Sequence, residues 1–351
     1  MPDQRIPAGL GFAVNRRQLV TCAHVVNAAL RRPAESTARP DADATVEAIF
    51  PLVGIDTPVR LRVTSWWPPD GSAADSDLAE ITLVEGELPP AVSSARLTVT
   101  EPGPGTEINL FGYPGNPPRI GHGAWSNSTL RGRVGRGLLQ IDMNPGTAMR
   151  TQPGYSGSPL LAKDPEAVET VVGMLSMSGK ANQNLDSYAV SVSSLARVLP
   201  SVLPEVLRQT FQAHFAKRRK NNLVDLVRKN AASLPHPFRL PPGEEPAVLL
   251  NRGLIIRWWN TTPHWKSGDG LMYTSKGVRL ASHPELLLTY EKLSRSFVYR
   301  SGGQMSSMYD RVPVTVDLML PHNQQIRLPE DSLAEETLGI TTAVCREMWR
   351  T

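Results

Sequence analysis

A serine flanked by glycines is the most chemically distinctive feature of this sequence. It lies in the segment Gly154-Tyr155-Ser156-Gly157-Ser158-Pro159, between two apolar runs expected to be β-strands. A serine hydroxyl becomes a strong nucleophile only when a base removes its proton, and the oxyanion formed by its attack needs backbone N–H donors. Glycine lets the backbone approach a substrate closely. The segment therefore favours a nucleophilic serine, although taken alone it also fits an ordinary glycine-rich turn.

A base and an acid in suitable contexts occur earlier in the chain. His24 closes the apolar strand that contains Leu19-Val20-Thr21-Cys22-Ala23, and Asp77 precedes the apolar pair Leu78-Ala79. Each has a simpler interpretation when taken singly, as a packed core histidine and as a boundary between a loop and a strand. Asp75 competes with Asp77 for the role of the acid. It lacks the following aliphatic residue and alanine, so Asp77 is preferred.

Together the three segments resemble the trypsin-like (chymotrypsin-fold) serine peptidases. In that family a histidine follows Thr-x-Ala, an aspartate precedes an aliphatic residue and alanine, and a serine lies in Gly-x-Ser-Gly-x-Pro, in this order. The α/β-hydrolases are excluded, because their order is Ser, Asp, His and Ser158 breaks their Gly-x-Ser-x-Gly motif. The resemblance covers about residues 9–200. It includes 9–14 as the strand before the histidine, 112–115 as a glycine-proline turn of intracellular bacterial members, and 188–190 as a strand of the primary pocket.

The resemblance implies a role for each matching residue. Ser156 would attack the scissile carbonyl, His24 would take and return the proton, and Asp77 would hold the imidazole in the right tautomer. The N–H groups of Gly154 and Ser156 would form the oxyanion hole. The substrate is then a protein or peptide, and neither a cofactor nor a metal is needed.

Two departures from trypsin itself affect activation and specificity. Trypsin has an acid just before the nucleophile that receives a freed N-terminus, whereas Tyr155 stands there in this chain and no pro-segment precedes Gly9. We therefore do not expect activation by N-terminal cleavage. The expected pocket residues include no acid that would select basic substrates, and Arg150 could favour acidic ones or point to solvent. These pocket residues are Arg150, Thr151, Ser176, Ser178 and Ala189.

The elements that must position these residues are short strands. Alternating apolar and polar residues predict antiparallel strands rather than helical crossovers. In the first set they are 11–14, 18–21, 46–50, 59–63 and 78–83. In the second set, after the irregular Pro- and Gly-rich segment 101–106, they are 107–112, 138–142, 158–161, 170–175 and 188–192.

The spacing of the apolar residues changes after Pro200. Apolar residues at helical spacing predict one helix over about 202–215 and a second near 223–227. A Pro-rich linker at 235–246 leads to a mixed segment that contains three tryptophans and a strand at 312–320. Short stretches between 318 and 346 faintly resemble a bacterial conflict-system module linked to von Willebrand factor A and MoxR-type ATPase partners. Residues 201–351 are the expected site of a regulatory protein partner.

Composition limits the other classes of function. The chain has 351 residues, 40% of them hydrophobic, a net charge of +4 and 31 prolines, which favours a β-rich globular protein. Its densest basic run, 217–220, has no interleaved aromatic residues, so we do not expect nucleic-acid binding. Cys22 and Cys345 are too few for a disulfide framework, and neither a signal peptide nor a membrane-spanning run is visible, which favours the cytoplasm. The spacing of His264, His283 and His322 predicts no metal site.

We therefore predict an all-β double antiparallel β-barrel of the trypsin type, followed by a smaller α+β domain. The protease domain is expected over 1–200, with barrels at about 9–97 and 106–200, then a helical segment at 201–234 and an accessory or regulatory domain at 247–351. The predicted function is a serine endopeptidase controlled through its C-terminal region, in a bacterial (antiviral) defence or signalling system. The rival prediction is a catalytically inactive trypsin fold that serves as a protein-binding module.

Overall fold

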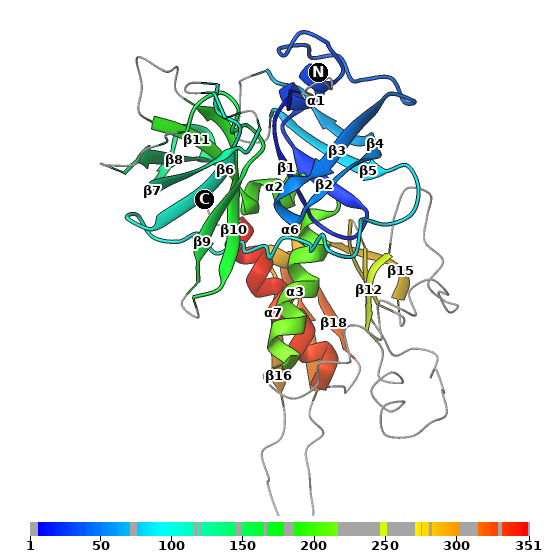
Figure 1. Ribbon diagram of the computed structural model, residues 1–351. Coiled ribbons are helices and arrows are strands. Elements are labelled where there is room, and N and C mark those ends of the chain that lie inside the picture. Colours follow the sequence, from blue (N-terminus) through cyan, green and yellow to red (C-terminus); the bar gives the residue numbers. More distant parts are fainter. Residues whose placement is uncertain are drawn as a thin grey trace, which may run out of the picture. The chain divides into compact units, whose positions relative to one another are not determined.

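The computed structural model divides the chain into two compact units, unit 1 (Met1–Val202) and unit 2 (Leu203–Thr351) (Figure 1). The structure describes residues 6–70, 76–115, 118–119, 121–144, 149, 151–164, 167–178, 186–216, 246–250, 271–274, 276–280, 283–301, 315–328 and 332–349.

The first sheet of unit 1 is a curled half-barrel. Its strands, blue to cyan in Figure 1, are β1 (Gly11–Ala13), β2 (Gln18–Thr21), β3 (Thr45–Phe50), β4 (Ile55–Trp67) and β5 (Leu78–Leu83), in the antiparallel order β1-β2-β5-β4-β3. Along β4, Leu61 and Val63 are buried whereas Arg60 and Arg62 are exposed, as the period-two pattern predicts. The inward side chains form one apolar core with α1 (Ala23–Ala29). A 3₁₀ turn, η1 (Pro51–Val53), joins β3 to β4.

The second sheet of unit 1 closes into a barrel. Its strands are β6 (Glu107–Gly112), β7 (Ala124–Val134), β8 (Leu138–Met143), β9 (Pro159–Lys163), β10 (Glu169–Ser178) and β11 (Asp186–Ser191), in the order β10-β11-β8-β7-β6-β9. The sequence pattern did not predict β7, which is continuous with the 3₁₀ turn η2 (Gly135–Gly137). Polar residues and a glycine interrupt the apolar residues of β7, so its pattern is weak. Closure removes free strand edges, and the interior is filled by aliphatic side chains around Tyr155.

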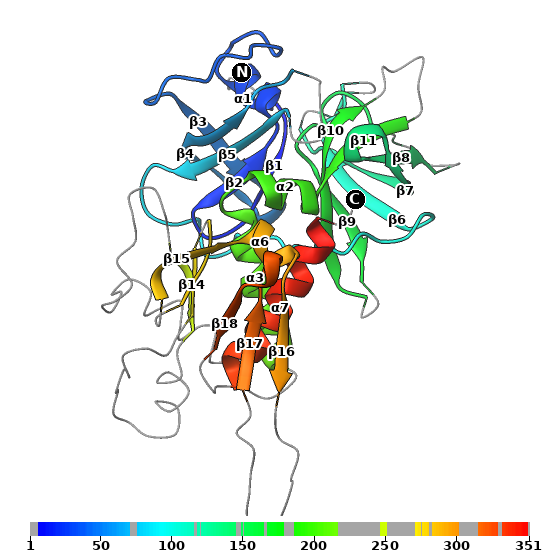
Figure 2. The ribbon, with the colours of Figure 1, turned by 180° about the vertical axis from the view of Figure 1, so that it is seen from behind.

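A short helix ends the β-rich part of the chain. It is α2 (Val192–Val198), where the hydroxyl of Ser191 accepts a hydrogen bond from Ser194 N at 3.1 Å and so caps the helix. Seen from behind, α2 lies between the half-barrel and the closed barrel, as it does from the front (Figure 2). The prediction of two antiparallel β units is confirmed, with one barrel closed and the other a curled half-barrel.

Unit 2 mixes helices with two small antiparallel sheets, which confirms the α+β prediction. The helices are α3 (Val202–Ala216), α6 (Tyr290–Ser294) and α7 (Ser332–Met348), with a 3₁₀ turn, η3 (Pro321–Asn323). One sheet contains β12 (Pro246–Leu250), β13 (Leu271–Thr274), β14 (Gly277–Leu280) and β15 (His283–Thr289). The other contains β16 (Phe297–Ser301), β17 (Thr315–Met319) and β18 (Gln325–Arg327).

Tyr273 lies at the centre of the core of unit 2. The Phe211 ring of α3 packs edge-on against the Tyr273 ring, with 5.3 Å between the ring centroids. The Thr341 hydroxyl of α7 donates to the phenolic oxygen of Tyr273 at 2.9 Å. The second expected helix, the tryptophans 258, 259 and 265, and the basic run 217–220 lie outside the described residues. Within the described ranges, none of the helices combines the length and the apolar character needed to cross a membrane.

Candidate active site

His24 lies in the first turn of a helix and not at the end of a strand. The strand β2 ends at Thr21 and α1 begins at Ala23, so the prediction that His24 closes the strand is wrong by one turn of backbone. The first N–H groups of a helix have no partner within the helix. Here the N–H of His24 donates to Asp77 Oδ1 at 2.9 Å, so the carboxylate satisfies one of these groups.

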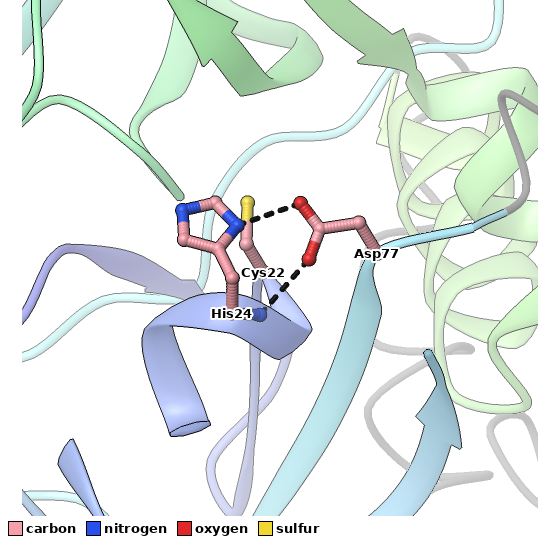
Figure 3. A group of neighbouring side chains, drawn as sticks. All are labelled: Cys22, His24 and Asp77. Carbon is pink, nitrogen blue, oxygen red and sulfur yellow. Dashed lines mark hydrogen bonds and ion pairs between the residues drawn. The ribbon is translucent and has the colours of Figure 1, made fainter. Parts of the chain in front are cut away.

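Asp77 holds His24 at two points. Besides the backbone contact, its Oδ2 lies 2.7 Å from His24 Nδ1 (Figure 3). The peptide groups of Asp77 are also fixed: its N–H donates to Pro68 O at 2.9 Å, and its carbonyl accepts from Ala23 N at 3.2 Å. Its φ of 59° lies in the left-handed region, which costs a non-glycine residue about 1–3 kcal/mol. This unusual backbone directs the carboxylate toward the histidine, and both rotation and translation of the ring are restricted.

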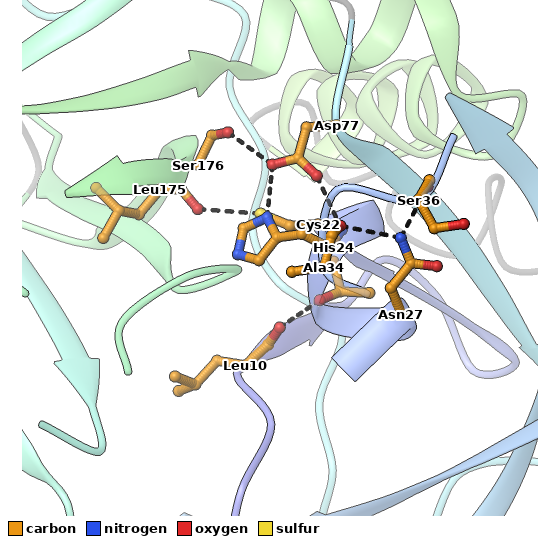
Figure 4. Close-up of polar contacts among 10 residues, drawn as sticks. Leu10, Cys22, His24, Asn27, Ala34, Ser36, Asp77, Leu175 and Ser176 are labelled. Carbon is orange, nitrogen blue, oxygen red and sulfur yellow. Dashed lines mark hydrogen bonds and ion pairs between the residues drawn. The ribbon is translucent and has the colours of Figure 1, made fainter. Parts of the chain in front are cut away.

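Ser176 supports the carboxylate from the closed barrel. Its hydroxyl donates to Asp77 Oδ2 at 3.1 Å (Figure 4). The pairing of β10 with β11 shifts between Leu175 and Met177, so Ser176 is the extra residue of a β-bulge. Bulges often re-aim a side chain beside a functional site. The sequence pattern placed Ser176 in the substrate pocket, and no signal in the sequence identified the bulge.

The loop that carries Ser156 depends on two glycines with positive φ. Gly154 has φ 105° and Gly157 has φ 82°. A Cβ on Gly154 would lie 2.1 Å from Tyr113 O, and one on Gly157 would lie 2.0 Å from Leu10 O. Only glycine fits at either position, so the predicted tight turn reflects the close approach of neighbouring backbone.

Several contacts place Ser156 against the segment that carries His24. Leu10 N donates to Ser156 O at 2.9 Å. A Cβ on Gly9 would lie 2.5 Å from Cγ2 of Val25, the residue after His24, and 3.1 Å from Ser156 O. The serine and the histidine segments therefore meet across the backbone of Gly9.

One carbonyl of β10 links the two segments more directly. Leu175 O accepts from Gly157 N at 2.8 Å and from the Cys22 thiol at 3.3 Å. Figure 4 shows Leu175 and Ser176 on the same side of the His24–Asp77 pair. Thus two consecutive residues of β10 contact the segments of all three residues that the sequence predicted.

The predicted nucleophile and base are not hydrogen-bonded to each other. Within the described part of the chain, no hydrogen bond joins the Ser156 hydroxyl to His24, and none occupies the N–H of Gly154 or of Ser156. Catalytic hydrogen bonds are often long in ligand-free proteins and tighten only with bound substrate. Among the described residues, these two N–H groups therefore have no hydrogen-bond partner.

The expected pocket residues have different environments. Thr151 is buried and its hydroxyl lies 2.7 Å from that of Ser187, and Ala189 is buried in the core of the closed barrel. Ser178 ends β10, where it pairs with Ser187. Arg150 and the competing acid Asp75 lie outside the described residues.

Cys22 lies beside the His24–Asp77 pair but already has a partner. Ligand-type atoms of Cys22, His24 and Asp77 all lie within 4.8 Å of one another. The two atoms of the His24–Asp77 pair are bonded at 2.7 Å, and the thiol donates to Leu175 O. Burial, reinforced by the Asp77 charge, raises the pKa of the Cys22 thiol well above its usual value. The thiol is therefore a neutral packing group with Leu175 O as its partner, whereas His24 Nδ1 and Asp77 Oδ2 are hydrogen-bonded to each other.

A family model and solved structures match part of this chain. Residues 9–174 match the family model described as a trypsin-like peptidase domain. No curated protein matches the chain. Among solved structures, the chain is similar to the inactive form of a serine-to-alanine mutant of Rv3671c from M. tuberculosis H37Rv, with 19% identity, a TM-score of 0.38, and coverage of 55% of this chain and 80% of that chain. Residues 9–174 of this chain therefore carry a trypsin-like peptidase domain.

Proposed function

We propose that this chain is a serine endopeptidase in which Ser156, His24 and Asp77 act as a catalytic triad. The observation that carries the proposal is the two-point hold of Asp77 on His24, at 2.9 Å to the backbone N–H and 2.7 Å to Nδ1. With Nδ1 donating to a carboxylate, the neutral ring keeps Nε2 free to accept a proton. Acyl transfer needs a nucleophile and a general base, and Ser156 on its glycine-flanked loop and His24 would supply them.

The proposed reaction proceeds through an acyl-enzyme. Ser156 Oγ attacks the scissile carbonyl while His24 Nε2 takes the hydroxyl proton, and the N–H groups of Gly154 and Ser156 receive the oxyanion. His24 then gives the proton to the leaving amine, and water releases the acyl group by the same steps in reverse order. Ser176 holds the carboxylate through its 3.1 Å bond to Asp77, so we assign it a positioning role.

The test is active-site labelling with a fluorophosphonate. We expect one adduct, on Ser156, in the wild type and none in Ser156→Ala. Ser93→Ala, which changes an exposed loop serine, is the matched control and should label normally. A folded wild type without an adduct at Ser156 would refute the peptidase and support the rival binding module.

We further propose that the C-terminal region receives a regulatory protein partner, with a role in bacterial defence or signalling. Support comes from Glu80, a buried carboxylate on β5 three residues after Asp77. Its Oε2 accepts from the N–H of Ser201 at 3.1 Å and from the Ser201 hydroxyl at 2.5 Å, immediately before α3 begins. Glu80 therefore ties Ser201, the residue before α3, to β5, the strand that follows Asp77.

Peptide hydrolysis by the full chain and by a chain ending at Val202 tests partner control. We expect a low but measurable rate in the full chain alone and a changed rate after truncation. Equal and high rates in both, without any added protein, would contradict the regulatory proposal and leave the peptidase proposal intact. The free, buried thiols of Cys22 and Cys345 support a reducing, cytoplasmic location within the same proposal.

A further inference from the structure

Tyr155 lies between the two residues whose N–H groups would receive the oxyanion. Although it belongs to a loop, its side chain is completely buried among the aliphatic residues of the closed barrel. Its hydroxyl donates to Ala124 O at 3.1 Å. A loop residue that extends its whole side chain into a core fixes the position of the backbone on either side of it.

The ring of Tyr155 rests directly on the backbone of Gly112. A Cβ at Gly112 would lie 2.3 Å from Tyr155 Cδ1 and 2.4 Å from Cγ. Gly112 pairs with Ala124 across β6 and β7. One pair of opposed residues at the end of this hairpin therefore receives both the ring and the hydroxyl of Tyr155.

The residue before Tyr155 is held by the same end of β6. Gly154 O accepts from Tyr113 N at 2.9 Å, and Gly154 adopts its φ of 105° where any Cβ would collide with Tyr113 O. On the other side, Gly157 N donates to Leu175 O at 2.8 Å. The loop is thus attached before and after Tyr155, and the buried ring attaches it at the middle.

The hydroxyl remains a donor over the whole useful pH range. Burial raises the pKa of Tyr155 to about 12, so it does not ionise in ordinary assays. This attachment comes from within the closed barrel.

We propose that Tyr155 is the positioning residue that holds the N–H groups of Gly154 and Ser156 ready for the oxyanion. This inference rests on the proposed serine peptidase function. In this inference, the buried phenol of Tyr155, packed on Gly112, orders the loop that carries the nucleophile. The residue acts through the backbone, since its side chain lies inside the barrel and does not face the reacting atoms.

The test compares oxyanion binding with substrate binding in the full chain. A peptidyl trifluoromethyl ketone forms a hemiketal with the serine and needs both N–H groups, whereas KM for the matching peptide depends less on them. We expect Tyr155→Phe to lose about tenfold in inhibitor affinity and kcat, and Tyr155→Ala at least about a hundredfold, with little change in KM. Gly112→Ala, which displaces the ring without altering Tyr155, should resemble Tyr155→Ala.

Leu130→Ala is the matched control, because Leu130 is fully buried in the same barrel core. It should lower thermal stability while leaving the ratio of inhibitor affinity to KM unchanged. If Tyr155→Ala or Gly112→Ala does not fold, Tyr155→Phe and Tyr155→Leu decide. Wild-type ratios in folded Tyr155 variants would overturn the inference, whereas a wild type that no fluorophosphonate labels would overturn the proposed function instead.

Discussion

Replacing Asp77 by asparagine separates the charge of the acid from its shape. Three donors converge on the carboxylate: the His24 N–H at 2.9 Å, His24 Nδ1 at 2.7 Å and the Ser176 hydroxyl at 3.1 Å. An amide offers one acceptor oxygen and one NH₂ group, so it cannot satisfy all three in their present roles. If the NH₂ group faced the backbone N–H of His24, two fixed donors would oppose each other at about 2.9 Å, which no rearrangement of protons relieves.

The amide oxygen will therefore face the backbone, and the NH₂ group will face Nδ1. The NH₂ group then opposes the N–H at Nδ1, and this conflict is relieved when the ring proton moves to Nε2. The Ser176 hydroxyl rotates so that its oxygen accepts a hydrogen bond from the same NH₂ group. The favoured tautomer of His24 can no longer take the proton of Ser156. A change of this kind in a Ser-His-Asp triad costs about 10⁴-fold in kcat, or about 5.5 kcal/mol in the activation free energy.

Steady-state peptide hydrolysis and thermal unfolding of the Asp77→Asn variant measure the two consequences. We expect kcat to fall about 10⁴-fold and the melting temperature to change little, because every buried donor keeps a partner. Asp43→Asn, at an exposed loop position, is the control and should behave as wild type. A kcat within about tenfold of wild type for Asp77→Asn would refute the tautomer argument.

Three further predictions follow from other contacts of the site. Ser176→Ala removes one of the donors to Asp77 and should lower kcat about tenfold with KM unchanged; an altered KM with normal kcat would place Ser176 in the pocket instead. Gly157→Ala should lower the free energy of unfolding by at least about 3 kcal/mol and the melting temperature by roughly 6–12 °C, because its Cβ would meet Leu10 O. Gly54→Ala is the control: its Cβ would lie in open space, so it should lower the free energy of unfolding by only about 1–2 kcal/mol. Because burial raises the pKa of the Cys22 thiol in the folded protein, its contribution to stability is present below about pH 8.5 and is lost above it, by up to about 1.4 kcal/mol per pH unit. Denaturant unfolding at pH 8 and pH 10 should therefore show a smaller loss for Cys22→Ala than for wild type, and equal losses would contradict the assignment.

The strands with a short apolar run or an alternating pattern were predictable from the sequence. The prediction of 18–21 for β2 and of 107–112 for β6 agrees with their bounds, because β2 is a short buried run and β6 alternates from Glu107 to Leu110. β7 was not predicted, because Asn127, Ser128 and Gly132 interrupt the pattern of its apolar residues. Its partners on both sides define it, and pairing between distant strands is not visible in a local window.

The candidate site was predictable as three residue types in order, but not as an arrangement. Nothing local in the sequence indicated that His24 would enter a helix or that Asp77 would adopt a positive φ, since both depend on contacts with distant segments. The bulge that turns Ser176 toward Asp77 depends on how β10 pairs with β11. The roles of these residues in catalysis stay predictions.

The dipeptide Leu175-Ser176 has a consequence for how such a chain can diverge. It contacts the segments of His24, Asp77 and Ser156 through short hydrogen bonds within the core, so part of their mutual placement is fixed without the loops between them. Surface loops tolerate insertions at a small entropic cost when the framework that they connect stays fixed. The loop at 32–44 is not free in this sense, because the buried Asn27 of α1 donates to Ala34 O at 3.0 Å and to Ser36 O at 2.9 Å. Loops that make no such contact with the segments of His24, Asp77 or Ser156 can change in length during evolution or engineering without altering the chemistry.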